Sequence, residues 1–190
     1  MQDIIKGEIQ GSIATKQEVL AKLVPDLEKT ANILINALKN NNKILICGNG
    51  GSAADAQHFA AELIVRFETE RKALPAIALT TDTSILTAGA NDYGIDTLFS
   101  RQIEGLGNKG DVLIAISTSG SSPNILKAIE AAKKKGMEVI GLTGRDAGKM
   151  KSLPIQNIII PSQTTARIQE AHIMAIHIWC KLIDSAFAGK

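Results

Sequence analysis

Five short, mainly apolar runs constrain the fold of this 190-residue chain more than any other feature. Their continuous apolar character, without alternation of polar residues, is typical of strands buried on both faces of a parallel sheet. Helical patterns separate the runs from one another. The predicted strands are Lys43–Cys47, Ala76–Leu79, Val112–Ile116, Glu138–Leu142 and Ile155–Ile160.

Apolar residues recur at helical spacing before and between these strands. The first forty residues predict two helices that separate near Pro25, because a proline disfavours helix in the residue before it. Further helices are predicted over residues 52–66, 123–135 and 164–186, with weaker helical stretches over 84–90 and 97–106. This alternation predicts an α/β fold, a three-layer α-β-α sandwich with a five-stranded parallel sheet. We expect one domain over residues 1–190, with an N-terminal helical extension over about 1–40.

The composition argues against several classes of function. Basic and acidic residues nearly balance, 21 against 19, so a net charge of +2 gives no reason to expect nucleic acid or a membrane as partner. No apolar run is long enough to span a membrane, and no secretory signal pattern is present, so we expect a cytoplasmic protein. Cys47 and Cys180 lie outside any metal-ligand spacing and are expected to pack as small apolar side chains.

Two polar loops directly follow predicted strands and should lie at the ligand-binding edge of the sheet. Ser117–Pro123 offers hydroxyls and a helix N-terminus, which suit a phosphate group; an ordinary serine-rich helix cap is the alternative. Gly48–Ser52 matches neither the Walker A pattern nor Gly-x-Gly-x-x-Gly, because Ala53 stands at the third glycine's position. This loop either lets a substrate approach the backbone or simply forms a tight strand-to-helix turn.

His58 and Glu62 are four residues apart, on one face of a predicted helix. An exposed surface pair is the simple interpretation, but the flanking residues are strongly apolar and a buried glutamate needs a partner. On the last helix, His177 lies about two turns after Gln169 and Glu170. Helical spacing alone does not decide which of these two faces the same point as His177. An imidazole–carboxylate cluster beside an anion-binding loop suits proton transfer on a phosphorylated small molecule.

Five longer motifs extend these patterns: CGNGGSAADAQHFAAEL at 47–63, LPAIALTTDTS at 74–84, NDYG at 91–94, GDVLIAISTSGSSPN at 110–124 and ARIQEAHIMAIH at 166–177. In these motifs the chain resembles the phosphoheptose isomerases, a family of sugar isomerase (SIS) domain proteins, over nearly its whole length. The resemblance implies a flavodoxin-like SIS fold. It also implies conversion of sedoheptulose 7-phosphate to D-glycero-D-manno-heptose 7-phosphate through an enediol, for the heptose of bacterial lipopolysaccharide or capsule.

The resemblance further implies a zinc ion in each subunit and a homotetramer with active sites near subunit interfaces. Glu62 and His177 resemble the catalytic acid–base pair of the family. The zinc ligands that it implies are His58, Glu62, Gln169 and His177. The substrate-binding residues that it implies are Asn49, Gly50, Gly51, Glu62, Asn91, Asp92, Ser117, Thr118, Ser119, Ser122 and Gln169.

One position departs from part of the family. Some members carry an aspartate where this chain has Ala166, so no role of that aspartate is expected here. A non-catalytic branch of the superfamily, which binds the bacterial replication initiator, shares the segment Phe67–Arg71 but has lost the glutamate and second histidine of the catalytic pair. This chain keeps Glu62 and His177, which favours an enzyme over that branch. A domain that senses sugar phosphates without turnover is the third hypothesis.

Overall fold

The computed structural model describes residues 1–153 and 155–189, and these form one five-stranded sheet in the order β2-β1-β3-β4-β5. Every neighbouring pair of strands is parallel, which confirms the predicted α/β sandwich. The strands are β1 (Ile44–Gly48), β2 (Ala76–Ala78), β3 (Val112–Ile116), β4 (Glu138–Gly144) and β5 (Gln156–Ile160).

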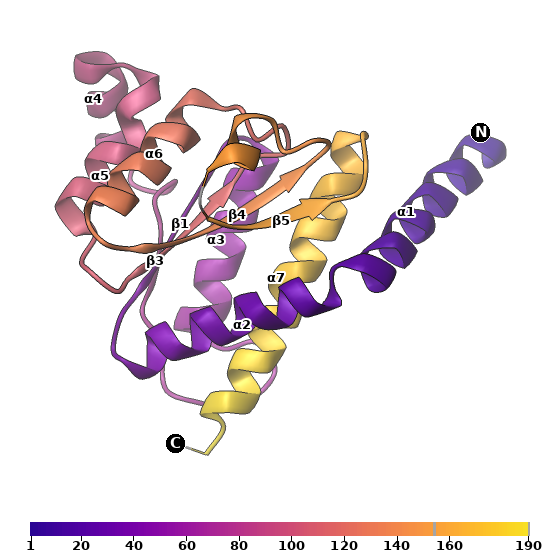
Figure 1. The fold of residues 1–190 in the computed structure, drawn as a ribbon, viewed down its shortest axis with the longest axis horizontal. Helices are drawn as coiled ribbons and strands as arrows, with labels where there is room; N and C mark the ends of the chain where they lie inside the picture. Colours follow the sequence, from indigo (N-terminus) through magenta and orange to yellow (C-terminus); the bar gives the residue numbers. More distant parts are fainter. Residues whose placement is uncertain (154, 190) are drawn as a thin grey trace.

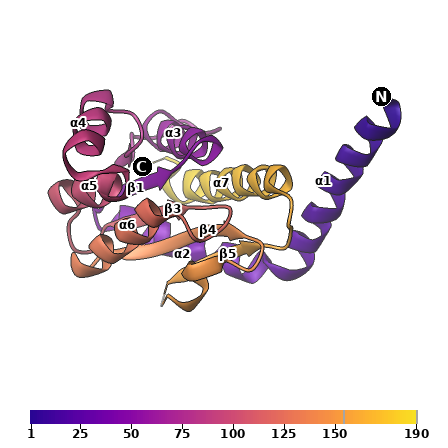
Figure 2. The same ribbon diagram turned by 90° about the horizontal axis from the view of Figure 1, so that it is seen from above.

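Helices cover both faces of the sheet (Figures 1 and 2). Successive strand residues point to opposite faces, so Ile44 and Ile46 enter one core while Leu45 and Cys47 enter the other. The first core packs against α2 (Val24–Lys39), α3 (Gly51–Ile64) and α7 (Thr165–Phe187), and the second against α5 (Leu98–Leu106) and α6 (Pro123–Lys134). The remaining elements are α4 (Thr83–Tyr93) and η1 (Ile95–Thr97), which follow β2 in the chain, and η2 (Gly148–Ser152), which lies between β4 and β5.

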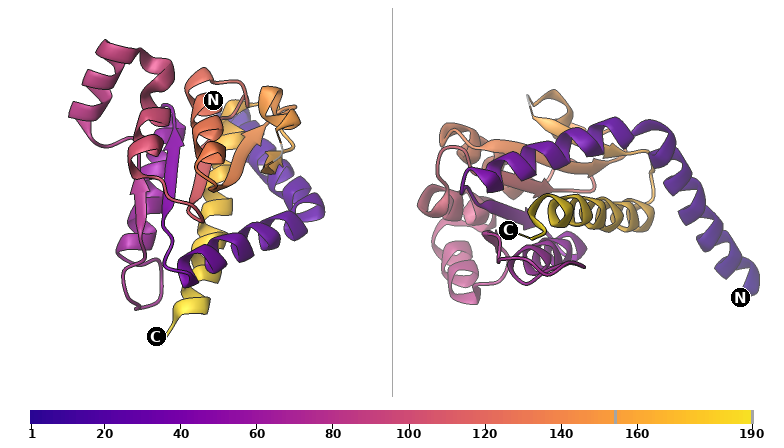
Figure 3. Two further views of the ribbon diagram at one scale, coloured as in Figure 1. Left: turned by 60° about the vertical axis from the view of Figure 1, so that its left-hand side comes forward. Right: turned by 90° about the horizontal axis from the view of Figure 1, so that it is seen from below.

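The first helix, α1 (Gln2–Lys22), extends away from the rest of the molecule, as the right-hand view of Figure 3 shows. The break after it falls at Leu23, and Pro25 lies in the first turn of α2, where a proline costs no helical hydrogen bond. Large apolar side chains along α1 are exposed, among them Ile5 at 57% and Ile9 at 55%. None of the helices described combines the length and apolar character needed to cross a membrane.

The strand order places the ends of β1 and β3 side by side, with Gly48 paired to Ile116. The chain leaves β1 toward α3 on one face and leaves β3 toward α6 on the other. Their loops therefore open at the topological switch point of the sheet, where parallel α/β folds bind ligands. This arrangement confirms the expected placement of the two polar loops at one edge.

Candidate functional site

The serine loop after β3 packs closely against the segment at Ala147, and several of its polar residues are partly exposed. Gly120 has a φ of 63°, and a Cβ there would lie 1.9 Å from the carbonyl oxygen of Ala147. Only glycine fits such a position. Ser122 holds the N-cap position of α6, but its hydroxyl makes no capping bond and lies 3.0 Å from the Ser117 hydroxyl. The Ser122 hydroxyl therefore does not cap α6, and phosphate binding by the loop stays a prediction.

Backbone donors of the same loop are available to an anion. The N–H groups of Ser119 and Ser122 donate to no atom of residues 1–153 and 155–189. Ser117 is buried, whereas Thr118, Ser119 and Ser122 are partly exposed. Free N–H groups at a helix start, combined with the helix dipole, attract phosphate oxygens. The arrangement suits a phosphate monoester without a lysine or arginine in the loop.

The glycine loop after β1 contacts both α6 and α7. The carboxamides of Asn49 and Asn124 form two reciprocal hydrogen bonds, of 3.0 and 2.8 Å, which link this loop to the start of α6. Gly50 has a φ of 55°. A Cβ on Gly51 would lie 2.5 Å from the Nε2 atom of Gln169, so the glycine allows α7 to approach the start of α3. The loop is thus part of a three-way junction.

Three predicted site residues meet where α3 packs against α7. The Nε2 atoms of His58 and His177 lie 2.9 Å apart, so one imidazole donates a hydrogen bond to the other. The Nε2 atom of His58 is also 3.3 Å from a carboxylate oxygen of Glu62. Phe67 stacks on the ring of His177 at a centroid distance of 5.4 Å. The Glu62 side chain is 20% exposed, which combines apolar shielding with access for a substrate.

The structure separates Gln169 from Glu170, which helical spacing could not do. Gln169 turns its amide toward Gly51. Glu170 instead accepts a 2.6 Å hydrogen bond from Arg167, which also pairs with Glu8 of α1. Gln169 therefore lies beside the glycine loop, while Glu170 ties α7 to α1.

Two predicted substrate contacts lie apart from this group. Asn91 and Asp92 are exposed at the end of α4, where the Asn91 amide donates a 2.7 Å hydrogen bond to the Asp92 carboxylate. Among the described residues, no hydrogen bond or ion pair joins either of them to the histidines or to the serine loop. Their role as substrate contacts stays a prediction.

The buried cysteines and the remaining histidine of α7 are structural. Burial raises the pKa of Cys47 and Cys180, which keeps both thiols protonated. Burial lowers the pKa of His172 to about 4, opposed by its 3.0 Å hydrogen bond to the Thr143 carbonyl. That bond requires the proton on Nε2, so His172 is a neutral donor within the core.

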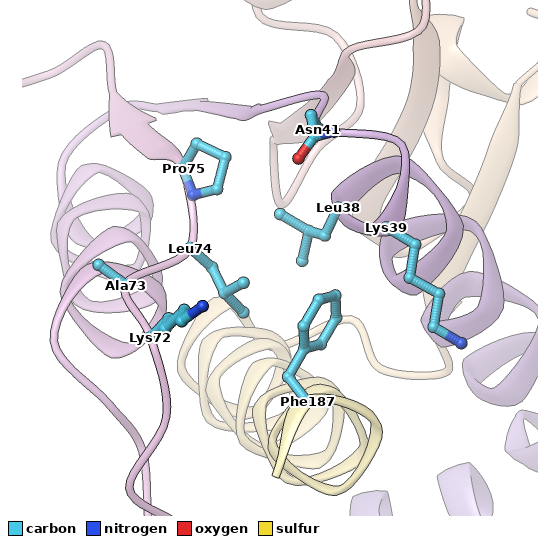
Figure 4. Close-up of a pocket in the computed structure, with 8 residues that line it drawn as sticks. All are labelled: Leu38, Lys39, Asn41, Lys72, Ala73, Leu74, Pro75 and Phe187. Atoms are coloured by element: carbon cyan, nitrogen blue, oxygen red, sulfur yellow. The ribbon is translucent and has the colours of Figure 1, made fainter. Parts of the chain in front are cut away.

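Two surface cavities differ in their position relative to these residues. The one drawn in Figure 4, of about 410 Å³, is lined by Leu38, Leu74, Pro75 and Phe187 with two lysines at its rim, near the amino ends of β1 and β2. It lies at the opposite edge of the sheet from the two polar loops, and the ionisable residues that line it are Lys39 and Lys72. A more open cavity of about 640 Å³ reaches His177, with Lys16, Phe67 and Met174 among its lining residues.

Known proteins similar to this chain agree with the geometry. The model of the SIS domain family matches residues 9–144. A phosphoheptose isomerase of Helicobacter pylori (strain P12) is 55% identical over 190 residues, covering 100% of this chain and 99% of that protein. The chain belongs to the phosphoheptose isomerase family of SIS-domain proteins.

Solved structures of the phosphoheptose isomerase family share the whole fold. One from Neisseria gonorrhoeae is 49% identical, with a TM-score of 0.90 over 97% of this chain and 98% of that one. Another, from Francisella tularensis, is 41% identical, with a TM-score of 0.93 and the same coverage of both chains. The resemblance read from the motifs is therefore confirmed for the family and the fold.

The donor atoms of the four predicted ligands in this phosphoheptose isomerase family member can be compared with those that zinc usually binds in proteins. Two imidazole nitrogens and a carboxylate are common zinc ligands, and the Gln169 amide is an uncommon one. Tetrahedral zinc sites place donors roughly 3.4 Å apart, close to the observed 2.9 and 3.3 Å. Within residues 1–153 and 155–189, no group of three or more His, Cys, Asp and Glu side chains is already arranged to hold a metal ion. The donor types fit zinc, and its binding stays a prediction.

Three residues of the site escaped the sequence analysis. Asn124 orients Asn49, and its signal was a polar residue directly after the proline that starts a helix. Asp55, one turn before His58, has an unpartnered buried oxygen, and burial raises its pKa to about 6 against the opposing effect of His58. An aspartate in so apolar a helix was the available signal. Phe67 gave none, because its contact with His177 depends on how a loop folds back.

Proposed function

We propose that the protein is an isomerase that converts sedoheptulose 7-phosphate to D-glycero-D-manno-heptose 7-phosphate. The observation that carries the proposal is the meeting of His58, Glu62 and His177 where α3 packs against α7, two helices that both begin at the sheet edge carrying the serine loop. The relatives named phosphoheptose isomerase match the chain over its full length, which supports the same substrate.

Isomerisation moves one proton between neighbouring carbons. Glu62 takes the proton from C1 of the open-chain ketose, and the electrons of that bond form the C1–C2 double bond of an enediol. The same carboxyl group returns the proton to C2, which completes the aldose. His177 carries a proton from the C1 hydroxyl to the C2 oxygen, as an imidazole with a neighbouring imidazole can.

The phosphate group is the proposed ligand of the serine loop. Thr118, Ser119 and Ser122 offer hydroxyls, and the free N–H groups and helix start add positive partial charge. Asn49, Gly50 and Gly51, on the neighbouring loop, are proposed to contact the sugar chain, together with Asn91 and Asp92. Fixing the phosphate places the carbonyl end of a seven-carbon substrate at a defined distance.

Zinc binding is a further part of the proposal. His58, Glu62, Gln169 and His177 would hold the ion, which when bound would polarise the oxygens of the substrate. A carboxylate bound to zinc is a weaker base, so the two roles of Glu62 compete. Proton transfer is its principal role in the proposal.

The exposed apolar face of α1 supports an assembly of several subunits. Ile4, Ile5, Ile9 and Ile13 are each more than half exposed, and surplus apolar helix surface of this kind usually contacts another subunit. The proposed assembly is a homotetramer in the cytoplasm, with each site completed by a neighbour, supplying heptose for lipopolysaccharide or capsule.

Turnover of the substrate tests the proposal directly. Purified protein is incubated with sedoheptulose 7-phosphate, and the aldose is followed by chromatography. Conversion supports the isomerase, whereas binding of the sugar phosphate without conversion supports the sensing alternative. Retention of both Glu62 and His177, each in contact with His58, argues against a non-catalytic partner of the replication initiator.

A further inference from the structure

Arg71 and Asp184 form an ion pair that the reaction does not use directly. Each side chain is 1% exposed, and the Nε–Oδ1 distance is 2.8 Å. Asp184 lies on α7, seven residues after His177, and Arg71 lies on the segment between α3 and β2. Burial of two charges is unfavourable unless further hydrogen bonds satisfy both groups, so their other partners matter.

The guanidinium group of Arg71 binds the end of the helix that carries Glu62. Nη2 donates to the carbonyl oxygen of Glu62 at 2.7 Å, and Nη1 donates to that of Leu63 at 2.9 Å. Carbonyls in the last turn of a helix have no partner within the helix. Arg71 therefore fixes the last turn of α3 to Asp184, and so to α7.

The second oxygen of Asp184 binds the loop that covers His177. It accepts hydrogen bonds from the backbone N–H groups of Glu68 and Thr69, both at 2.8 Å. The residue before them, Phe67, stacks on the His177 ring. Burial favours the neutral carboxyl, but the bonds from Thr69, Glu68 and Arg71 hold the pKa of Asp184 below its usual value, so it stays charged.

Resting on the proposed function, we infer that the Arg71–Asp184 pair positions Glu62 and His177 relative to each other. One side of the pair holds the backbone of the proposed base, and the other holds the ring packed on the proposed proton carrier. Both residues are positioning residues, since neither touches the reacting atoms. If the pair instead served only stability, its loss would change folding without changing the geometry of the site.

The chain contains a matched control for this distinction. Asp111 is 2% exposed and, like Asp184, accepts hydrogen bonds from two backbone N–H groups, those of Lys43 and Asn108, and pairs with the Lys43 ammonium group. It joins the segments that precede β1 and β3, and among the described residues it bonds to none of α3, α7 or Phe67. Asp111→Asn therefore removes an equivalent buried carboxylate without altering α3, α7 or Phe67.

The test compares Asp184→Asn and Arg71→Lys with Asp111→Asn at a temperature where each variant is folded by circular dichroism. We expect Asp184→Asn and Arg71→Lys to lower kcat at least about 10-fold, because misplacement of catalytic groups by an ångström can cost about 100-fold. KM should change less than about threefold, since the phosphate loop is untouched. Asp111→Asn should keep the wild-type kcat. Lysine keeps the positive charge but cannot reproduce the hydrogen bonds of the guanidinium group. Arg71→Lys should therefore lose kcat although the charge is kept.

A second readout is independent of turnover. Ring-labelled histidine gives few NMR signals, because the chain has 3 histidines. The ring-current shift that Phe67 causes at His177 should disappear in Asp184→Asn and persist in Asp111→Asn. Equal kcat values in the two variants, with unchanged His177 shifts, would overturn the inference.

If Asp184→Asn does not fold, Phe67→Leu, which keeps the ion pair, must lower kcat or the inference fails. A wild-type protein without turnover would contradict the proposed function, while the NMR comparison would still decide the positioning.

Discussion

His58 on α3 and His177 on α7 lie 119 positions apart in the chain, yet their Nε2 atoms are 2.9 Å from each other. The packing beneath them explains the contact. Phe59 and Trp179, each adjacent or nearly adjacent to a histidine in sequence, are fully buried with ring centroids 6.2 Å apart. The apolar faces of the two helices thus fix the distance between the imidazoles.

The serine loop gives the first prediction. Replacing both Ser119 and Ser122 with alanine should weaken binding of sedoheptulose 7-phosphate by roughly 10²- to 10⁴-fold, because hydrogen bonds to a charged group contribute about 1.5–3 kcal/mol each and two are lost. Isothermal titration calorimetry measures the change. Binding of sedoheptulose without phosphate is the control and should scarcely change. Equal losses for both sugars would show that the loop does not recognise the phosphate.

Much of this architecture could be predicted because buried parallel strands are nearly continuous in apolar residues. The loops after β1 and β3 were placed correctly, since strand ends fix loop positions. Helical spacing alone could not choose between Gln169 and Glu170, and only the family resemblance favoured Gln169, because both directions lie within the scatter of that spacing and packing against Gly51 separates them. The Arg71–Asp184 pair was also missed, since no local pattern links residues 113 positions apart.

The second prediction concerns acid stability. His172 has a pKa of about 4 in the folded protein, against 6.5 as its ordinary value. Between these pH values the unfolded chain binds a proton that the folded protein does not, so this contribution to stability falls as pH falls from 6.5 to 4. Asp55, with its pKa raised to about 6, acts in the opposite direction over much of the range.

Comparison with His172→Gln isolates the histidine from Asp55. The free energy of unfolding of the wild type, relative to the variant, should rise by about 3 kcal/mol between pH 4 and pH 7. Urea titrations at several pH values give this difference. A difference that does not depend on pH would mean that His172 is not held neutral by the core.

The third prediction concerns the exposed face of α1. Replacing Ile5 and Ile9 with glutamate should prevent assembly and lower activity together, because charges at an apolar contact between subunits must be desolvated. Light scattering and the isomerase assay measure the two effects. Gln2→Glu with Gln10→Glu adds the same charge at positions that are already polar, and should change neither. A fully active monomer would show that each site is complete within one chain.

Glu62→Gln, assayed in D₂O, tests the central claim most directly. The amide keeps the shape of the side chain but cannot accept a proton, and a positioned base contributes about 10²–10⁴-fold to rate. NMR should show the wild type forming the aldose with solvent deuterium at the carbons that exchange protons. The variant should bind sedoheptulose 7-phosphate with similar affinity but lose turnover and deuterium incorporation together. Wild-type turnover in Glu62→Gln, or a folded wild type that forms no aldose, would contradict the account.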